Sequence, residues 1–201
     1  MRIAVSLVLL YLIVTPTHAG ILEVIAGREG VSGTFLQRIE SAEGQEVERS
    51  RGDFKLMKPH YLFWNITHPD RQLLLAKDHL LTQIDWDLEV VVERTLNEQE
   101  RGPLAWLMAS REALERVFLV DESDPDVVTL RSRDLEASVR EVVIAIPEAA
   151  LWEITVIDAA EQRIEIALTI NEDTVPSLAD FALPETDFVG TRPQVAPDDP
   201  R

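Results

Sequence analysis

From Gly33 onward the chain consists mainly of short runs of strand-forming residues, separated by polar or turn-forming clusters at intervals of about ten residues. The runs predict strands over residues 34–40, 52–57, 61–67, 73–76, 80–84, 88–96, 127–131, 141–146, 151–157, 163–170 and 180–184. Runs 151–157 and 163–170 flank the turn 158–162 and are expected to form a hairpin. The pattern predicts one antiparallel β domain, which must hide its apolar face in a second sheet or by curling around something.

The strand pattern is interrupted near the middle of the chain. Pro103 follows Gly102 and suits the first turn of a helix, so the apolar segment 104–109 is predicted to be helical. Residues 112–120 fit either a continuation of this helix or a strand. Residues 20–29 predict a short amphipathic helix, and the proline- and aspartate-rich residues 190–201 predict a disordered tail.

The predicted strand 61–67 is apolar on both faces. Leu62, Trp64 and Ile66 fall on one face, and Tyr61 and Phe63 fall on the other. Such a strand is covered on both sides, or one of its faces lines a pocket. The pattern therefore leaves two interpretations open. One is an ordinary sandwich core, and the other is a curved sheet whose concave face holds an apolar ligand beneath the helix 104–109.

The N-terminus has the features of a secretory signal. Met1 and Arg2 precede an apolar run over residues 3–14, and residues 15–19 provide a proline and a small residue for cleavage after Ala19. The run is shorter than the roughly 20 residues that span a bilayer. Gly20 at the new N-terminus is not a cysteine, so no acyl anchor is expected. The predicted divisions are a signal at 1–19, a single domain at 20–189 and the tail at 190–201.

Charge and composition exclude several functions. The chain has 201 residues with 19 basic and 36 acidic side chains, a net charge of −17 and no cysteine. Removal of the signal takes away one arginine and no acid, which leaves −18. Such a polyanion is repelled by phosphate backbones, which argues against nucleic acid as a partner. The absence of cysteine from the sequence excludes disulfides and thiol catalysis.

The sequence offers little for catalysis or metal binding. His60, His68 and His79 lack the close spacing of a metal site and are expected to face solvent. The chain contains no nucleophile elbow, phosphate loop or zinc-protease motif. Asp85 and Asp87 flank a turn, where aspartates are common. We therefore expect a binding protein without catalytic residues, metal or cofactor.

An ordered set of short motifs runs through most of the chain. Its members are Phe35-Leu36-Gln37, Gly52-Asp53-Phe54, Lys58-Pro59-x-x-Leu62-x-Trp64, Pro69, Asp85-x-Asp87-Leu88-Glu89, Gly102-Pro103-Leu104, Asp158, Gln162 and Asp180-Phe181-x-x-Pro184. Behind a signal peptide and without a lipid-attachment cysteine, this set resembles the periplasmic outer-membrane lipoprotein carrier family, LolA. The chain looks like a divergent member of it.

The resemblance implies a mainly β fold with helices, in which an incomplete antiparallel β-barrel is closed by a helical lid over an apolar cavity. It implies a monomeric carrier that takes acyl chains of lipoproteins from an inner-membrane ABC transporter to an outer-membrane receptor. By position, the cavity residues would be Leu62, Trp64 and Ile66. The lid residues would be Leu104, Trp106, Leu107 and Met108.

Two departures from the family pattern leave alternatives open. Lys58 stands where the family usually has an arginine that latches the lid, and lysine lacks the planar fork of that side chain. Leu62 stands where a phenylalanine is common in the cavity wall. A LolA-like carrier of another envelope lipid or glycolipid, or a domain that binds or senses outer-membrane proteins, remains an alternative function.

Overall fold

The computed structural model describes residues 20–95, 106, 107, 109–185 and 188. Its helical elements are α1 (Ile21–Ala26), α3 (Arg111–Val117) and the 3-10 helix η1 (Leu178–Phe181). Its strands are β1 (Gly30–Glu40), β2 (Glu46–Met57), β3 (Tyr61–His68), β4 (Gln72–Lys77), β5 (Leu80–Asp85), β6 (Val90–Thr95), β7 (Phe118–Asp124), β8 (Val127–Ser132), β9 (Val139–Glu148), β10 (Leu151–Asp158) and β11 (Arg163–Ile170). No helix among these residues is long and apolar enough to cross a membrane.

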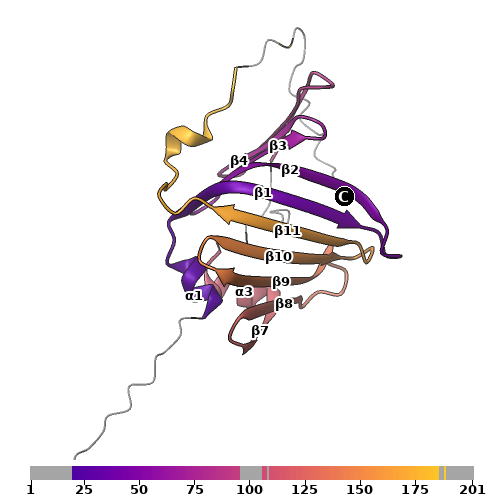
Figure 1. Ribbon diagram of the computed structural model, residues 1–201, viewed down its shortest axis with the longest axis vertical. Helices are drawn as coiled ribbons and strands as arrows, with labels where there is room; N and C mark the ends of the chain where they lie inside the picture. The colour runs from indigo at the N-terminus through magenta and orange to yellow at the C-terminus, as the bar shows by residue number, and fades with distance from the viewer. Residues whose placement is uncertain (1–19, 96–105, 108, 186–187, 189–201) are drawn as a thin grey trace, which may run out of the picture.

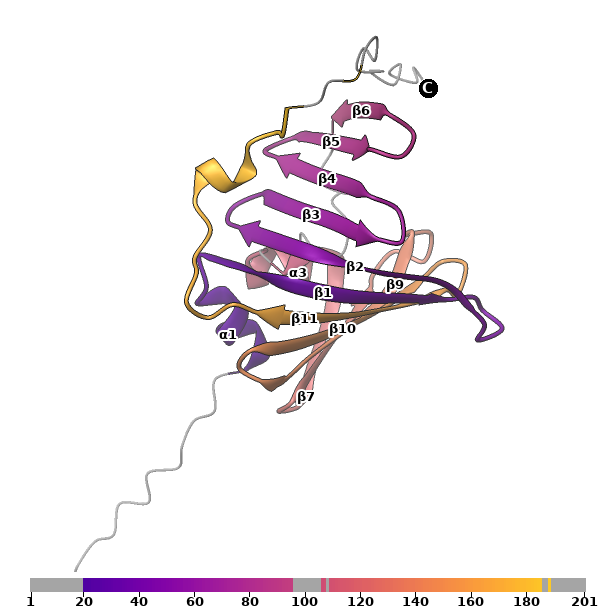
Figure 2. The same cartoon turned by 45° about the horizontal axis from the view of Figure 1, so that its top comes forward.

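The eleven strands form one antiparallel sheet in the order β6-β5-β4-β3-β2-β1-β11-β10-β9-β8-β7. β1 joins the two halves, because it pairs with β2 on one side and with β11 on the other. β6 and β7 are the two edges, and the sheet curves strongly between them (Figure 1). Figure 2 shows β3 to β6 continuing the sheet away from α1 and α3. The predicted incomplete antiparallel β-barrel is confirmed.

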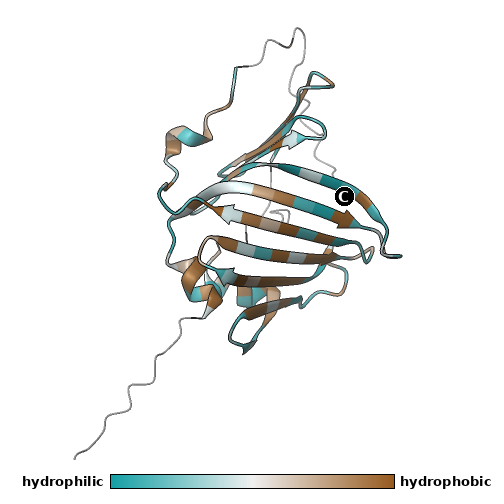
Figure 3. Cartoon of the chain, viewed as in Figure 1, coloured by the Kyte–Doolittle hydropathy of each residue, from teal (hydrophilic) through white to brown (hydrophobic). Residues whose placement is uncertain are grey.

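Alternation along the strands separates an inner face from an outer face. Phe35, Phe54 and Leu168 are buried on the inner face, where they share one core cluster with residues of α1 and α3. Figure 3 shows the resulting hydrophobic and hydrophilic bands along β1, β10 and β11. The concave side of the sheet is therefore mainly apolar, while most of the convex side meets solvent.

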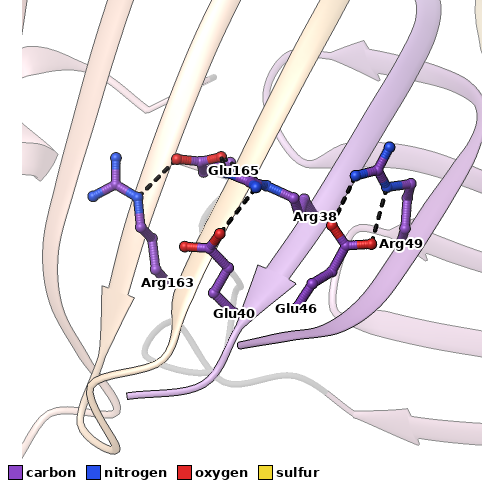
Figure 4. A network of polar contacts seen from close by, with 6 residues as sticks. All are labelled: Arg38, Glu40, Glu46, Arg49, Arg163 and Glu165. Carbon is purple, nitrogen blue, oxygen red and sulfur yellow. Dashed lines mark hydrogen bonds and ion pairs between the residues drawn. The ribbon is translucent and has the colours of Figure 1, made fainter. Parts of the chain in front are cut away.

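On the outer face an ion pair links β1 to β11, and β2 carries a separate pair between Arg49 and Glu46 (Figure 4). Arg38 reaches Glu165 at 2.6 Å and Glu40 at 2.9 Å, while Arg163 also reaches Glu165 at 2.7 Å. Hydrogen bonds from Arg163 and then Arg38 lower the pKa of Glu165. The pair between Arg38 and Glu165 supports the register of β1 against β11 from the side that faces away from the apolar core.

Two glycines permit the close backbone approach that the curvature requires. A Cβ atom on Gly33 would lie 1.9 Å from the carbonyl oxygen of Thr169, and one on Gly52 would lie 1.8 Å from that of Asn65. Gly52 also adjoins a bulge in the pairing of β2 with β3. Because no larger residue fits at either position without moving the backbone, these glycines mark where the strands bend against each other.

The outer face of β3 to β5 is the exception to the solvated convex side. Leu73, Leu75 and Ile84 are buried there together with Phe181 of η1, whose ring lies 5.4 Å from that of Tyr61. This outer cluster explains why the strand 61–67 is apolar on both faces. The C-terminal segment covers one face, and the core covers the other.

The prediction of a strand over 180–184 is wrong, because residues 178–181 form the 3-10 turn η1. Asp180 accepts hydrogen bonds from both the backbone and the side chain of Ser177, which favours a turn over an extended chain. Lys55 then fixes the turn to β2 through a 2.8 Å ion pair with Asp180. These contacts lower the pKa of Asp180 well below its usual range, the Lys55 bond having the largest effect.

The remaining strand predictions are confirmed with shifted boundaries, whereas the predicted helix 104–109 lies largely outside the described residues. The predicted N-terminal helix is α1, and the hairpin around 158–162 joins β10 to β11. The ambiguous residues 112–120 divide into helix up to Val117 and strand from Phe118. The predicted signal 1–19 and tail 190–201 lie outside the described residues, so the predicted domain divisions remain predictions.

Candidate functional site

The three predicted cavity residues lie side by side on the inner face of β3. Trp64 is only 4% exposed, and its ring stacks on that of Phe35 with centroids 3.6 Å apart. Leu62 and Ile66 are partly buried and pack against the same core cluster. The register extends this wall into β4, where Leu74 lies opposite Trp64. The structure therefore gathers all three residues on the concave side.

Residues of the predicted lid cover part of this interior. Leu107 is 2% exposed, and the Trp106 ring meets the ring of Phe118 edge-on at 4.7 Å. The other two predicted lid residues, Leu104 and Met108, lie outside the described residues. Among the described residues, the cover thus consists of residues 106 and 107, followed by α3.

Two buried residues here were not predicted from the sequence, one in the α3 part of the cover and one in β7, against which Trp106 packs. Leu114 on α3 is 3% exposed and Phe118 is 1% exposed, and both belong to the core cluster. The sequence signal for these residues was Ser110, because serine is a preferred N-cap residue. In the structure the Ser110 hydroxyl accepts a hydrogen bond from the Ala113 amide, and a new helix begins at Arg111. Leu114 lies on the buried face of that helix.

A pocket of about 640 Å³ opens where α1, the turn between β2 and β3, and the cover meet. Ala26, Pro59, Trp106 and Leu114 contribute to its lining. Its volume is within the range of sites that bind small organic ligands. The pocket shows that the cover does not seal tightly against α1 and the turn between β2 and β3.

Lys58 lies at the edge of this pocket and contacts α1. Its ammonium Nζ donates a hydrogen bond of 2.6 Å to the carbonyl oxygen of Ala26, and its backbone N–H donates to the carbonyl of Glu29 at 3.0 Å. Ala26 is the last residue of α1, so the lysine charge meets the end of the helix where carbonyl groups are left unpaired. Lys58 therefore ties the connection between β2 and β3 to α1.

The described interior contains little that could perform chemistry. Within residues 20–95, 106, 107, 109–185 and 188, no three His, Asp or Glu side chains gather in a way that could hold a metal ion. The carboxylates with clearly shifted pKa values, such as Glu46, Glu165 and Asp180, belong to surface ion pairs. The arrangement offers an apolar wall and a cover, which suit the binding of an apolar ligand.

Comparison with known families agrees with this architecture. Residues 26–182 match the family model described as outer membrane lipoprotein carrier protein LolA. The chain belongs to the LolA family. The matched region begins at the last residue of α1 and includes every strand of the sheet as well as η1. The family resemblance carried by the ordered motifs is thereby confirmed, and LolA is a family of carriers.

Individual relatives are distant from this chain. It is 28% identical over 149 residues to the outer-membrane lipoprotein carrier protein of Xanthomonas oryzae pv. oryzae, covering 71% of each chain. It is 26% identical over 159 residues to that of Alkalilimnicola ehrlichii, covering 77% of this chain and 74% of the relative. A solved LolA superfamily protein from Nitrosomonas europaea aligns over 81% of this chain and 96% of its own, with 13% identity and a TM-score of 0.45.

Proposed function

We propose that this protein is a periplasmic carrier that binds the acyl chains of lipoproteins and shuttles them from an inner-membrane ABC transporter to an outer-membrane receptor. The observation that carries the proposal is the mainly apolar inner face, with Leu62, Trp64 and Ile66 in its wall and Leu107 and Leu114 in its cover. Membership of the LolA family supports the same role.

The energetics suit a carrier that must also release its cargo. Each methylene of an acyl chain that leaves water gains roughly 0.8 kcal/mol. In the structure, however, the cover residues Leu107 and Leu114 are already buried in the core cluster. An incoming chain must displace these side chains and expose them elsewhere. Part of the gain is thereby cancelled, and the complex remains loose enough for transfer.

The lid and its latch are part of the proposal. Leu104, Trp106, Leu107 and Met108 would form the moving cover. Lys58 would serve as the latch at the edge of the pocket, in the position of the family arginine. Its bond to the Ala26 carbonyl supports a variant of this role, in which the lysine holds α1. The ammonium group of lysine is a compact charge on a flexible stem and suits a bond to one carbonyl oxygen. The planar guanidinium of arginine suits two parallel hydrogen bonds.

The proposed location follows from the predicted signal. Residues 1–19 would direct export and be removed after Ala19, releasing a monomer into the periplasm. Gly20 is the N-cap of α1, with its carbonyl accepting bonds from the amides of Glu23 and Val24. From the predicted cleavage site, we expect Gly20 to be the first residue of the exported protein, as measured by its intact mass. A mass that includes residues 1–19 would contradict this.

The decisive test uses a purified triacylated lipopeptide as cargo. The protein is mixed with the lipopeptide in detergent, the detergent is removed, and the soluble fraction is analysed by gel filtration and native mass spectrometry. We expect a soluble complex of one protein and one lipopeptide, and no complex with the same peptide lacking its acyl chains. If the lipopeptide precipitates alone while a known carrier keeps it soluble, the proposed function is wrong.

One observation supports the alternative cargo, another envelope lipid. Lys58, Arg111 and Arg116 line the pocket of about 640 Å³, and none of the described residues in its lining is a carboxylate. Arg111 is held by Glu122 at 2.7 Å, but Arg116 approaches Glu112 only at 4.0 Å. A lipid phosphate at the pocket would meet Lys58 and Arg116. Native mass spectrometry of lipid co-purified with the protein distinguishes the two cargoes.

A further inference from the structure

Two polar atoms are buried in the apolar interior without a partner. Ser50 is 1% exposed and Trp152 is 0% exposed. Among the described residues, the Ser50 hydroxyl Oγ and the Trp152 indole Nε1 are the buried side-chain polar atoms that lack a hydrogen bond. Such atoms are rare in folded proteins, because a buried donor that has given up water without gaining a partner is destabilising. Each one therefore calls for a physical explanation.

Both residues face the concave side of the sheet. Ser50 lies on the same side of β2 as Phe54 and is buried like it, while its neighbour Arg51 is exposed. Trp152 belongs to the core cluster together with Ile154 on the same strand. The two side chains thus lie in walls of the same interior that the proposed function assigns to acyl chains.

The register places the two atoms on opposite sides of the central strands β1 and β11. Trp152 lies opposite Leu168, whereas Ser50 lies opposite Gln37, which in turn lies opposite Ile166. The two residues are therefore three strands apart and displaced by two positions along the strand. These offsets correspond to about 14 Å and about 7 Å along the sheet surface. The curvature of the sheet makes the direct path across the interior shorter.

The chemistry of the two atoms defines what satisfies them. Indole Nε1 only donates a hydrogen bond, and a serine hydroxyl can donate one as well. A pure hydrocarbon leaves both unpaired. An acyl chain, in contrast, is joined to the rest of its molecule through an ester or amide carbonyl, whose oxygen accepts hydrogen bonds. A molecule with several acyl chains carries several such carbonyls.

We propose that Ser50 Oγ and Trp152 Nε1 are anchors that donate hydrogen bonds to the carbonyl groups of acyl-linked cargo. The anchors make the interior selective for acyl chains over alkyl chains of equal length, and they fix how far the chains enter. This inference rests on the proposed function, because it assumes that the chains occupy the concave side.

The test compares two zwitterionic lipids with identical headgroups and C16 chains, one ester-linked and one ether-linked. The ether-linked lipid lacks the carbonyl groups but keeps the same hydrocarbon. Binding of each lipid is measured with wild-type protein, Ser50→Ala and Trp152→Phe by native mass spectrometry. Wild-type protein is expected to prefer the ester-linked lipid by roughly 10-fold, and each variant is expected to lose about half of this preference on a logarithmic scale.

Thermal unfolding supplies a readout that separates an anchor from a structural hydroxyl. Since Ser50 Oγ has no partner in the unliganded protein, Ser50→Ala should leave Tm unchanged or raise it. Ser32→Ala is the matched control, because the Ser32 hydroxyl is also buried but donates to the Thr174 carbonyl at 3.4 Å. That variant should lower Tm and keep the ester preference.

The outcomes keep this inference apart from the proposed function. If wild-type protein binds neither lipid and takes up no lipopeptide, the carrier function itself fails. If it binds both lipids equally, or if the two variants keep the wild-type preference, the anchors are overturned while the carrier function stands. A fall in Tm for Ser50→Ala as large as that for Ser32→Ala would also overturn the role of Ser50.

Discussion

Replacement of Leu114 by alanine should weaken the fold and tighten lipid binding at the same time. Leu114 lies on α3, is 3% exposed and packs into the core cluster beneath the cover. If acyl chains occupy the interior, this side chain must leave its place when cargo enters. The leucine then stabilises the empty, closed form and contributes nothing comparable to the open form.

The expected magnitude follows from the burial. Leu→Ala at a buried site costs about 2–5 kcal/mol, and a short helix at the surface can settle over part of the gap, so we expect about 2–3 kcal/mol. For a protein of this size, that lowers Tm by about 4–12 °C. The same free energy shifts the equilibrium between closed and open forms, so the apparent Kd for lipid should fall by roughly 30- to 150-fold.

The assay combines calorimetric unfolding with titration of a fluorescent fatty acid. Leu130→Ala is the matched control, since Leu130 is 0% exposed but belongs to β8 and stays in the sheet in both forms. It should lower Tm by a comparable amount without tightening binding. A Leu114→Ala variant that binds lipid more weakly, in step with its lost stability, would refute the displacement of α3 by cargo.

Three further results are expected. Leu62→Glu should abolish lipid binding while circular dichroism shows an intact sheet. The control Leu36→Glu, at a 62% exposed site on the outer face, should bind lipid normally. Unfolding of Leu62→Glu would show that Leu62 is an ordinary core residue. Asp180→Asn should lower Tm at pH 7, because the ionised Asp180 carboxylate beside Lys55 stabilises the fold at pH values above its ordinary pKa of 3.8. The difference in Tm from wild type should disappear as the pH falls through the lower pKa of the folded state. A difference in Tm that does not change with pH would contradict this. Arg38→Gln should lower Tm in dilute buffer and much less in 1 M salt, where charges are screened within about 3 Å. An equal decrease in Tm under both conditions would show that Arg38 stabilises the fold by packing and not by charge.

Much of the fold was readable from the chain because strands leave a local signature. The alternation of apolar and polar residues in 151–157 and 163–170 identified β10 and β11 and their hairpin. The strand 61–67 was correctly placed, and its two apolar faces were correctly recognised as both covered or lining a pocket. The pattern could not say what covers each face, because the covering residues lie far away in sequence.

The prediction failed where a distant contact outweighed the local pattern. Residues 180–184 look strand-forming by composition, yet Phe181 is buried against β3 to β5, and Lys55 holds the turn in place from β2. Leu114 and Phe118 were missed for a related reason. α3 has seven residues and is followed directly by β7, so neither the helical period nor the strand period repeats often enough to be recognised.

The sequence by itself determined the strand periodicity, the acidic charge, the absence of cysteine and the ordered motifs of the LolA family, because each of these depends on residue identity and spacing alone. Only the tertiary structure decided which face of β3 is the interior, that Lys58 reaches the Ala26 carbonyl, and that Ser50 and Trp152 bury unpaired polar atoms in the same concavity. Those facts depend on strands that are distant in the chain and adjacent in the sheet. The side-chain period of two shows that a face exists, but only the pairing of strands shows what that face meets.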